Sequence, residues 1–118
     1  MKKLYNQKSK DLLLKKLKSE DFNRTTCSFY KYVTIIDPLI LRDRIYEEFD
    51  NIDILGRVYI AEEGINAQIS VPDKNWGLFL KLISNIKLLH GADIKTAIND
   101  GISFYKLIVK VKKEIVAY

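Results

Sequence analysis

The spacing of hydrophobic and polar residues along the chain predicts most of its secondary structure. Leucines one helical turn apart among lysines predict a short helix over residues 9–19. A second helix is predicted over 38–51, where Asp37 supplies the cap and Pro38 the first turn, and a third over 72–91. Runs rich in aromatic and β-branched residues predict strands over 27–36, 55–61, 67–71 and 104–111, and a short extended piece over 93–98.

After the first helix, the predicted order is β-α-β-β-α-β. The two middle strands are expected to form a hairpin, because Gly64 and Asn66 in their connection accept unusual backbone angles. This split order is typical of an α+β, ferredoxin-like sandwich, in which two helices cover one face of a four-stranded antiparallel sheet. We expect residues 1–24 to form an N-terminal helical extension and residues 25–118 to form the domain.

With both helices on one side, the other face of the sheet is open, and strand alternation predicts what it displays. The apolar residues of the strand over 67–71 belong against the helices, so the polar residues turn outward. The complete outward set is Arg57, Tyr59, Asn66, Gln68, Ser70, Lys106 and Lys110. The strand over 27–36 leaves both registers open, because aromatic residues fall on both faces, with Tyr30 and Tyr32 on one and Phe29 on the other.

Composition narrows the class of protein. A chain of 118 residues with 47% hydrophobic and 30% charged residues has the size and balance of one globular domain. The single cysteine, Cys27, cannot form an intramolecular disulfide, and the first residues lack a secretory signal. Charges interrupt every apolar run before it reaches the length of a membrane helix. We therefore expect a cytoplasmic protein without a membrane partner.

The open face offers the clearest candidate chemistry. Cations bind phosphates, an aromatic ring stacks on an unpaired base and side-chain amides read base edges, so this mixture favours RNA binding. The net charge of +5 supports that interpretation only mildly. A merely solvated face, or a face covered by another domain, explains the same residues. The basic first helix is expected to pack its leucines on the domain, although a helix of this kind also binds membranes or nucleic acid.

Catalytic and cofactor motifs are missing from the sequence. Cys27 has no CxxC partner, and one histidine, His90, is a poor supply of metal ligands. The isolated glycines do not form a phosphate-binding loop, and the adjacent residues Glu62 and Glu63 point in opposite directions in an extended chain. We therefore predict no catalytic residue, no metal site and no cofactor in this domain.

Three segments together resemble one family. They are SFYKY at 28–32, GRVYIAEEGINAQISVP at 56–72 and FYKLIVKVK at 104–112. The family is that of the rhodanese-domain tRNA uridine hydroxylases, and the resemblance extends over nearly the whole chain. It implies an acylphosphatase-like N-terminal domain followed by a rhodanese domain that carries an essential cysteine. It also implies that the whole enzyme is an oxidoreductase that uses molecular oxygen to hydroxylate the wobble uridine of certain tRNAs.

The chain matches only the N-terminal domain of that family. It contains no rhodanese domain, and Cys27 does not correspond to the family's cysteine. We therefore expect a domain that belongs to a longer enzyme. The domain alone is expected to have no activity and to present the tRNA anticodon arm to the rest of the enzyme. The candidate substrate-binding residues are Lys31, Arg57, Tyr59, Glu63, Gly64, Asn66, Gln68, Lys106 and Lys110, with Lys112 as a further point charge.

Several alternatives stay open or are disfavoured. The main alternative is an interaction domain that packs on the rhodanese domain without touching RNA. Arg57 is placed to bind a phosphate or to pair with Glu62 or Glu63. The hairpin turn either contacts RNA or only satisfies its own backbone. A free-standing acylphosphatase is disfavoured because residues 36–38, Ile-Asp-Pro, are acidic and poor in donors, and an RNA-recognition motif is disfavoured because AQISV replaces its aromatic signature.

Overall fold

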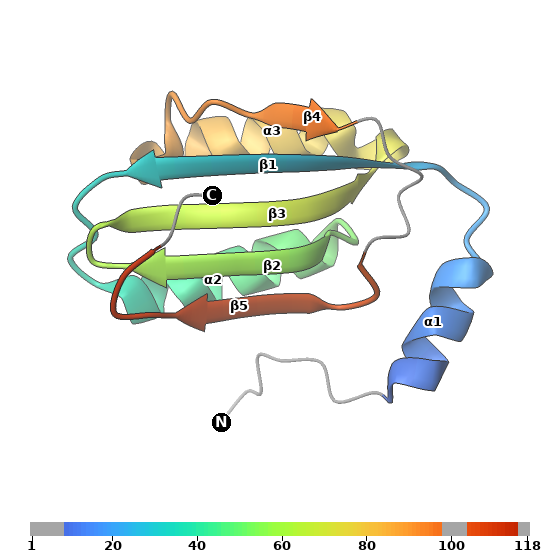
Figure 1. Cartoon of the computed structure of the whole chain (residues 1–118). Helices are drawn as coiled ribbons and strands as arrows, with labels where there is room; N and C mark the ends of the chain where they lie inside the picture. Colours follow the sequence, from blue (N-terminus) through green and yellow to red (C-terminus); the bar gives the residue numbers. More distant parts are fainter. Residues whose placement is uncertain (1–8, 98–103, 116–118) are drawn as a thin grey trace.

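A five-stranded sheet organises the domain, in the order β4-β1-β3-β2-β5 (Figure 1). The computed structural model describes residues 9–97 and 104–115. The helices are α1 (Lys10–Lys18), α2 (Pro38–Asn51) and α3 (Trp76–Asn85), with short 3₁₀ helices at Asp73–Asn75 and Lys87–Leu89 on either side of α3. The strands are β1 (Arg24–Tyr32), β2 (Leu55–Ala61), β3 (Gly64–Pro72), β4 (Lys95–Ala97) and β5 (Leu107–Val111).

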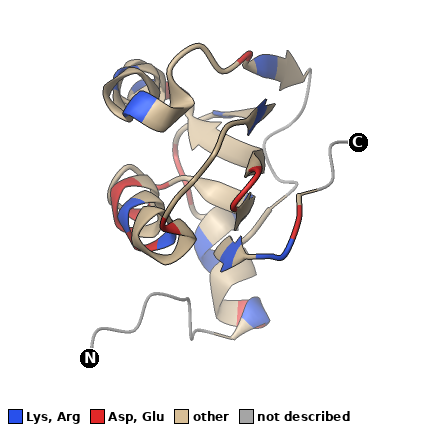
Figure 2. Ribbon diagram, turned by 90° about the vertical axis from the view of Figure 1, so that its left-hand side faces the viewer, with Lys and Arg blue, Asp and Glu red and all other residues tan. Residues whose placement is uncertain are grey.

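Helices α2 and α3 cover one face of this sheet, as the edge-on view shows (Figure 2). The core lies between the two layers and is centred on Phe79. The ring centroid of Phe79 lies 6.4 Å from that of Phe29, 6.1 Å from that of Phe49 and 5.3 Å from that of Trp76. The opposite face, toward the viewer in Figure 1, carries neither helix and is called the open face below.

Local signals explain where α1 and α2 begin. The Asp37 side chain accepts a hydrogen bond from the Ile40 backbone N–H at 3.3 Å, and Pro38 is the first helical residue, which confirms the predicted bounds of α2. Helix α1 matches the prediction to within a residue at each end. Its Leu13 and Leu17 are buried beside the beginnings of β2 and β5, which confirms that the helix packs on the domain.

Arg24 holds the segment between α1 and β1 against the sheet. Its guanidinium donates two hydrogen bonds to the Glu20 carboxylate, both at 2.7 Å. It also donates to the carbonyl oxygens of Asp53 at 2.8 Å and Ser70 at 3.1 Å. Because the Arg24 side chain is only 4% exposed, this pairing is needed to keep a buried charge satisfied.

The prediction of a four-stranded antiparallel sheet is wrong in two respects. The strand expected over 104–111 is β5, which pairs parallel to β2, so the sheet is mixed. The fourth antiparallel strand is instead β4, which arises within the extended piece over 93–98 and pairs with β1. All three residues of β4 are exposed, so this edge strand carries no hydrophobic pattern. The α+β class of the domain and the position of α2 and α3 on one face of the sheet are as predicted.

Strand and helix ends also differ from the predicted ones. β1 begins and ends earlier than 27–36, but the backbone N–H groups of Val33 and Ile35 still donate to the carbonyl oxygens of Glu63 at 3.0 Å and Glu62 at 2.8 Å. The extended pattern therefore continues beside the hairpin turn without forming a regular ladder. β3 is longer than 67–71, β5 is shorter than 104–111, and the helix predicted over 72–91 is divided into α3 and the two 3₁₀ helices.

Candidate nucleic-acid interface

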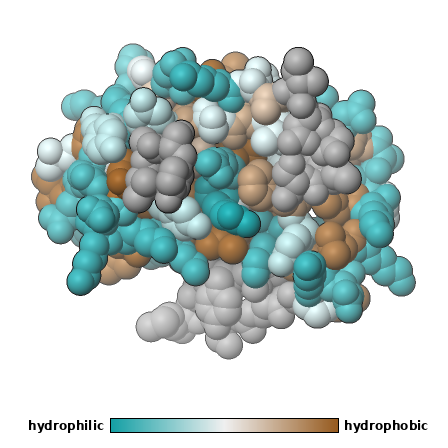
Figure 3. All heavy atoms as spheres, viewed as in Figure 1, coloured by the Kyte–Doolittle hydropathy of each residue, from teal (hydrophilic) through white to brown (hydrophobic). Residues whose placement is uncertain are grey.

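Two rows of side chains cross four strands of the open face. Residues at the same register position of paired strands point to the same face, so the strand pairing places each row directly. The first row is Tyr30, Asn66, Tyr59 and Lys110, from β1, β3, β2 and β5 in turn. The neighbouring row is Ser28, Gln68, Arg57 and Ile108. Hydrophilic and hydrophobic residues are mixed on the surface seen from this side (Figure 3).

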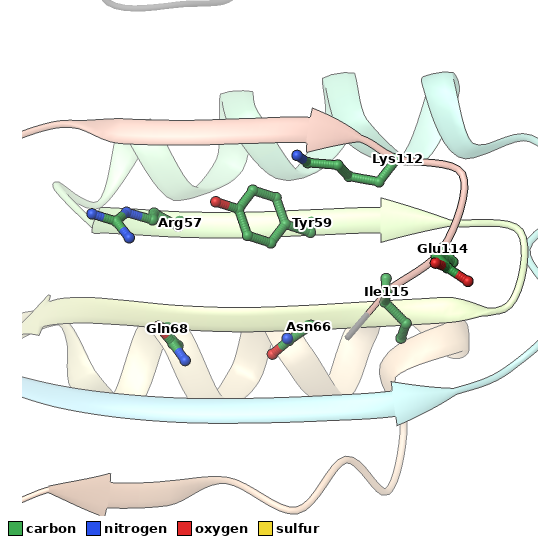
Figure 4. A pocket seen from close by; sticks show the side chains of 7 residues that line it. All are labelled: Arg57, Tyr59, Asn66, Gln68, Lys112, Glu114 and Ile115. Atoms are coloured by element: carbon green, nitrogen blue, oxygen red, sulfur yellow. The ribbon is translucent and has the colours of Figure 1, made fainter. Parts of the chain in front are cut away.

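A pocket of about 350 Å³ lies over β2 and β3, and we call it the cationic pocket (Figure 4). Within it, the Lys112 ammonium lies 4.9 Å from the ring centroid of Tyr59. Arg57 also borders a neighbouring hollow, where its guanidinium lies 6.0 Å from the ring centroid of Phe104. Both distances allow a cation–π attraction that holds the cations over the sheet. The pocket is lined by Arg57, Tyr59, Asn66, Gln68, Lys112, Glu114 and Ile115.

A second pocket, of about 360 Å³, lies over β1 and β3, and we call it the tyrosine pocket. The rings of Tyr30 and Tyr32 meet edge to face, with centroids 6.1 Å apart and planes at 77°. These side chains are 49% and 58% exposed. The lining consists of residues 28–32, Asn66, Gln68, residues 91–93 and Lys95.

The structure brings together most of the residues predicted for the open face. Arg57, Tyr59, Asn66 and Gln68 line one pocket, and Lys110 lies beside Tyr59 in the first row. Lys106 lies just before β5 and borders a hollow of about 60 Å³ together with Arg57. Lys112, the further point charge, reaches over Tyr59.

Two other predicted residues make contacts within the fold. Lys31 lies two residues after the buried Phe29 in β1, so it has the parity of Phe29 and does not belong to the two rows. Its ammonium donates a hydrogen bond to the carbonyl oxygen of His90. Ser70, expected on the open face, is fully buried. Because the Ser70 carbonyl oxygen accepts from the Arg24 guanidinium, this end of β3 belongs to the packed part of the fold.

The turn residues make contacts with the protein's own backbone. Glu63 accepts a hydrogen bond from the Ile115 backbone N–H at 2.6 Å, which fixes the segment after β5 at the end of the open face. Gly64 has a φ of 153°, and a Cβ there would lie 2.1 Å from the Lys31 carbonyl oxygen. The described residues contain no ion pair between Arg57 and either Glu62 or Glu63.

Two features of the open face could not be predicted from the sequence: which residues of β1 face outward, and the position of the segment that follows β5. The structure resolves the register by turning Tyr30 and Tyr32 to the open face and burying Cys27 and Phe29. Glu114 and Ile115 line the cationic pocket although no pattern marks them, since they follow the last strand. The signal available for Tyr30 and Tyr32 was the alternation of inward and outward residues along β1. It was ambiguous because aromatic residues occur at both odd and even positions of this strand.

Other chemistry is not provided by the described residues. Burial raises the pKa of the Cys27 thiol to about 12, so this side chain is neutral and inaccessible in the fold. Within residues 9–97 and 104–115, no group of three or more His, Cys, Asp or Glu side chains is arranged to hold a metal ion. None of the helices in these ranges is long and apolar enough to span a membrane.

Comparison with known proteins identifies relatives over almost the whole chain. Three of them, each named tRNA uridine(34) hydroxylase, show the degree of similarity. The protein from Leptospira interrogans serovar Lai is 44% identical over 115 residues, that from Citrobacter koseri is 45% identical over 116, and that from Escherichia coli O17:K52:H18 is 47% identical over 116. Each alignment covers 97% of this chain but only 31%, 33% and 33% of the respective relative. The chain thus spans about a third of the length of these relatives.

A solved structure and a family profile complete the comparison. The dark-state structure of the BLUF protein BlrB superimposes with a TM-score of 0.55 at 15% identity, over 78% of this chain and 75% of that one, which supports the fold alone. The profile described as the UPF0176 acylphosphatase-like domain matches residues 24–115. With the relatives, this match confirms the predicted family: the chain belongs to the UPF0176 family of tRNA uridine(34) hydroxylases and corresponds to its N-terminal acylphosphatase-like domain.

Proposed function

We propose that this domain binds the anticodon arm of tRNA on its open face and presents the wobble uridine for oxygen-dependent hydroxylation by a longer enzyme. The observation that carries the proposal is the cationic pocket. It combines Arg57 and Lys112 with an aromatic ring and two side-chain amides, and Lys110 lies beside it. These are the groups that bind phosphates, stack on bases and read base edges. The relatives' name supplies the tRNA and the position of the uridine.

Removal of charge from the open face tests this proposal. The double variant Lys106→Ala/Lys110→Ala, and separately Arg57→Ala, should weaken binding of the 118-residue chain to tRNA in a fluorescence anisotropy titration. The slope of log K against log salt should become shallower by about 0.7 to 1 for each phosphate that the variant no longer neutralises. A matched control is Lys81→Ala/Lys87→Ala, which removes two exposed lysines from the helical side. Equal affinity and slope for the open-face and control variants would contradict the proposal.

A second candidate function, docking to another domain without RNA contact, is favoured by a different surface. Ile36, just before α2, and Leu39 and Ile40, in its first turn, are 93%, 65% and 67% exposed. Apolar side chains gathered in this way often mark a protein contact. Crosslinking of tRNA to a full-length relative separates the two candidates. Crosslinks in the segments equivalent to β1, β2 and β3 support RNA binding by this domain, and crosslinks confined to the remaining two thirds of the chain support docking alone.

A further inference from the structure

Asn66 and Gln68 lie between the two pockets and belong to both linings. Both side chains come from β3, which is flanked by β1 on one side and β2 on the other. Neighbouring strands are about 4.8 Å apart, so groups held over β1 and over β2 are separated by about 10 Å. The open face is therefore divided into two compartments that share a row of amides.

The tyrosines of the two compartments differ in what already covers them. The ring of Tyr59 has the Lys112 ammonium 4.9 Å from its centroid. Among the described residues, Tyr30 and Tyr32 have one aromatic contact, the edge-to-face contact with each other, and about half of each side chain is exposed. A base can stack on an exposed aromatic face, whereas a cation over a ring is suited to a phosphate. This difference assigns base stacking to the tyrosine pocket and phosphate binding to the cationic pocket.

The edge of the sheet beside the tyrosines is not a paired strand. β4 pairs with β1 only at Thr26, Cys27 and Ser28, and residues 91–93 border the tyrosine pocket instead. The charges over both pockets favour a polyanion. Apart from Lys31, whose ammonium is bound to the His90 carbonyl oxygen, the linings contain the cationic residues Lys95, Arg57 and Lys112 and the carboxylates Asp93 and Glu114. Lys110, beside Tyr59, adds a further positive charge to the first row.

The role of the tyrosine pocket selects the state of the RNA. In a stacked helix the neighbouring bases cover both faces of a base, so a base that stacks on Tyr30 or Tyr32 must have left that stack. Unpaired loop nucleotides meet this condition and a duplex does not.

We propose that the open face is a site for two neighbouring unpaired nucleotides, with one base stacked on Tyr30 or Tyr32 and the adjoining phosphate held by Arg57 and Lys112. Asn66 and Gln68 contact both nucleotides from the ridge between them. This inference rests on the proposed RNA-binding function and adds to it the role of each pocket and the need for an unpaired strand.

The test compares two RNAs and three tyrosine variants of the 118-residue chain. The RNAs are a synthetic hairpin with an unpaired loop and a blunt duplex with the same number of phosphates, and binding is measured by fluorescence anisotropy. At least one of Tyr30→Leu and Tyr32→Leu should weaken hairpin binding by about 5- to 150-fold, the cost of losing one stacked base. Neither variant should change binding of the duplex or the salt slope for the hairpin. Tyr30→Phe, which keeps the ring, should bind the hairpin like the wild type.

The outcomes separate this inference from the function on which it rests. If Lys106→Ala/Lys110→Ala weakens hairpin binding but the leucine variants do not, the two-nucleotide site is wrong and the proposed function stands. Equal losses for hairpin and duplex in Tyr30→Leu, or a loss in Tyr30→Phe as large as in Tyr30→Leu, also overturn the site. If the wild-type chain binds neither RNA, the proposed function itself is overturned. Circular dichroism and thermal unfolding of every variant confirm that each one is folded.

Discussion

At Gly64 the backbone approaches β1 too closely to admit a side chain. A Cβ built there would lie 2.1 Å from the Lys31 carbonyl oxygen and 3.0 Å from the Tyr32 Cα. We therefore expect Gly64→Ala to lower the free energy of unfolding by about 2–4 kcal/mol, because the hairpin turn must move away from β1. Urea unfolding monitored by circular dichroism measures this loss.

Gly77 provides the matched control for that substitution. It lies within α3, and a Cβ at this position would meet nothing within 4 Å. Gly77→Ala should therefore raise the free energy of unfolding by about 0.5–1 kcal/mol, since alanine restricts the unfolded chain and favours a helix. Similar effects of the two substitutions would show that close approach is not what requires glycine at position 64.

Cys27 gives a pH dependence whose sign can be worked out. Burial raises the pKa of its thiol from 9.0 to about 12, so between these values the folded chain keeps a proton that the unfolded chain releases. Stability from this group is complete below pH 9 and is lost as the pH rises toward 12. At pH 10 the wild type should have lost about 1.4 kcal/mol more than Cys27→Ala, relative to each protein at pH 7. Parallel pH profiles of the two proteins would contradict this assignment.

The alternation of apolar and polar residues along a strand correctly predicted which face of the sheet each residue occupies, where every second residue was clearly apolar. In β2 and β3 it placed Arg57, Tyr59 and Gln68 on the open face, because the intervening residues were plainly hydrophobic. In β1 both parities contain aromatic residues, and only packing against α3 decides that Phe29 is buried. Contacts between distant segments, such as Glu63 with the Ile115 backbone, have no local signal and could not be predicted.

At the scale of elements, α1 is held to the domain by one side of the helix. Leu13 and Leu17 are buried, whereas Leu12 on the same helix is 60% exposed. Leu17→Ala should lower the free energy of unfolding by about 2–3 kcal/mol, since it removes buried methyl groups and leaves a cavity. Leu12→Ala should change it by less than about 0.5 kcal/mol. Equal effects in thermal unfolding would mean that α1 does not pack on the domain in solution.

The elements themselves were more predictable than their arrangement. Helix α2 and strand β2 have the predicted bounds because a cap, a proline and a clear period mark them locally. The strand order depends on pairings between distant segments, which no local pattern specifies. The pattern of β5 is strong but does not indicate parallel pairing with β2, and β4 is an exposed edge strand of three residues. The family resemblance predicted the acylphosphatase-like domain but not the added fifth strand.

At the scale of the whole molecule, the two proposed surfaces lie on different parts of the fold. The pockets occupy the open face, whereas Ile36, Leu39 and Ile40 lie at the beginning of α2, which covers the opposite face (Figure 2). The proposed RNA site and the proposed docking surface therefore do not overlap. RNA binding and domain docking are therefore separable by substitution.

The exposed apolar cluster tests that separation. The triple variant Ile36→Ser/Leu39→Ser/Ile40→Ser removes apolar surface that is already in water, so it should fold normally and bind the RNA hairpin with unchanged affinity. If the cluster docks another domain, the variant should bind the remaining two thirds of the E. coli relative, supplied as a separate polypeptide, at least 10-fold more weakly by calorimetry. Lys110→Ala should have the reverse pattern, with weaker RNA binding and unchanged docking. A loss of RNA binding in the triple variant would instead mean that the two surfaces act as one.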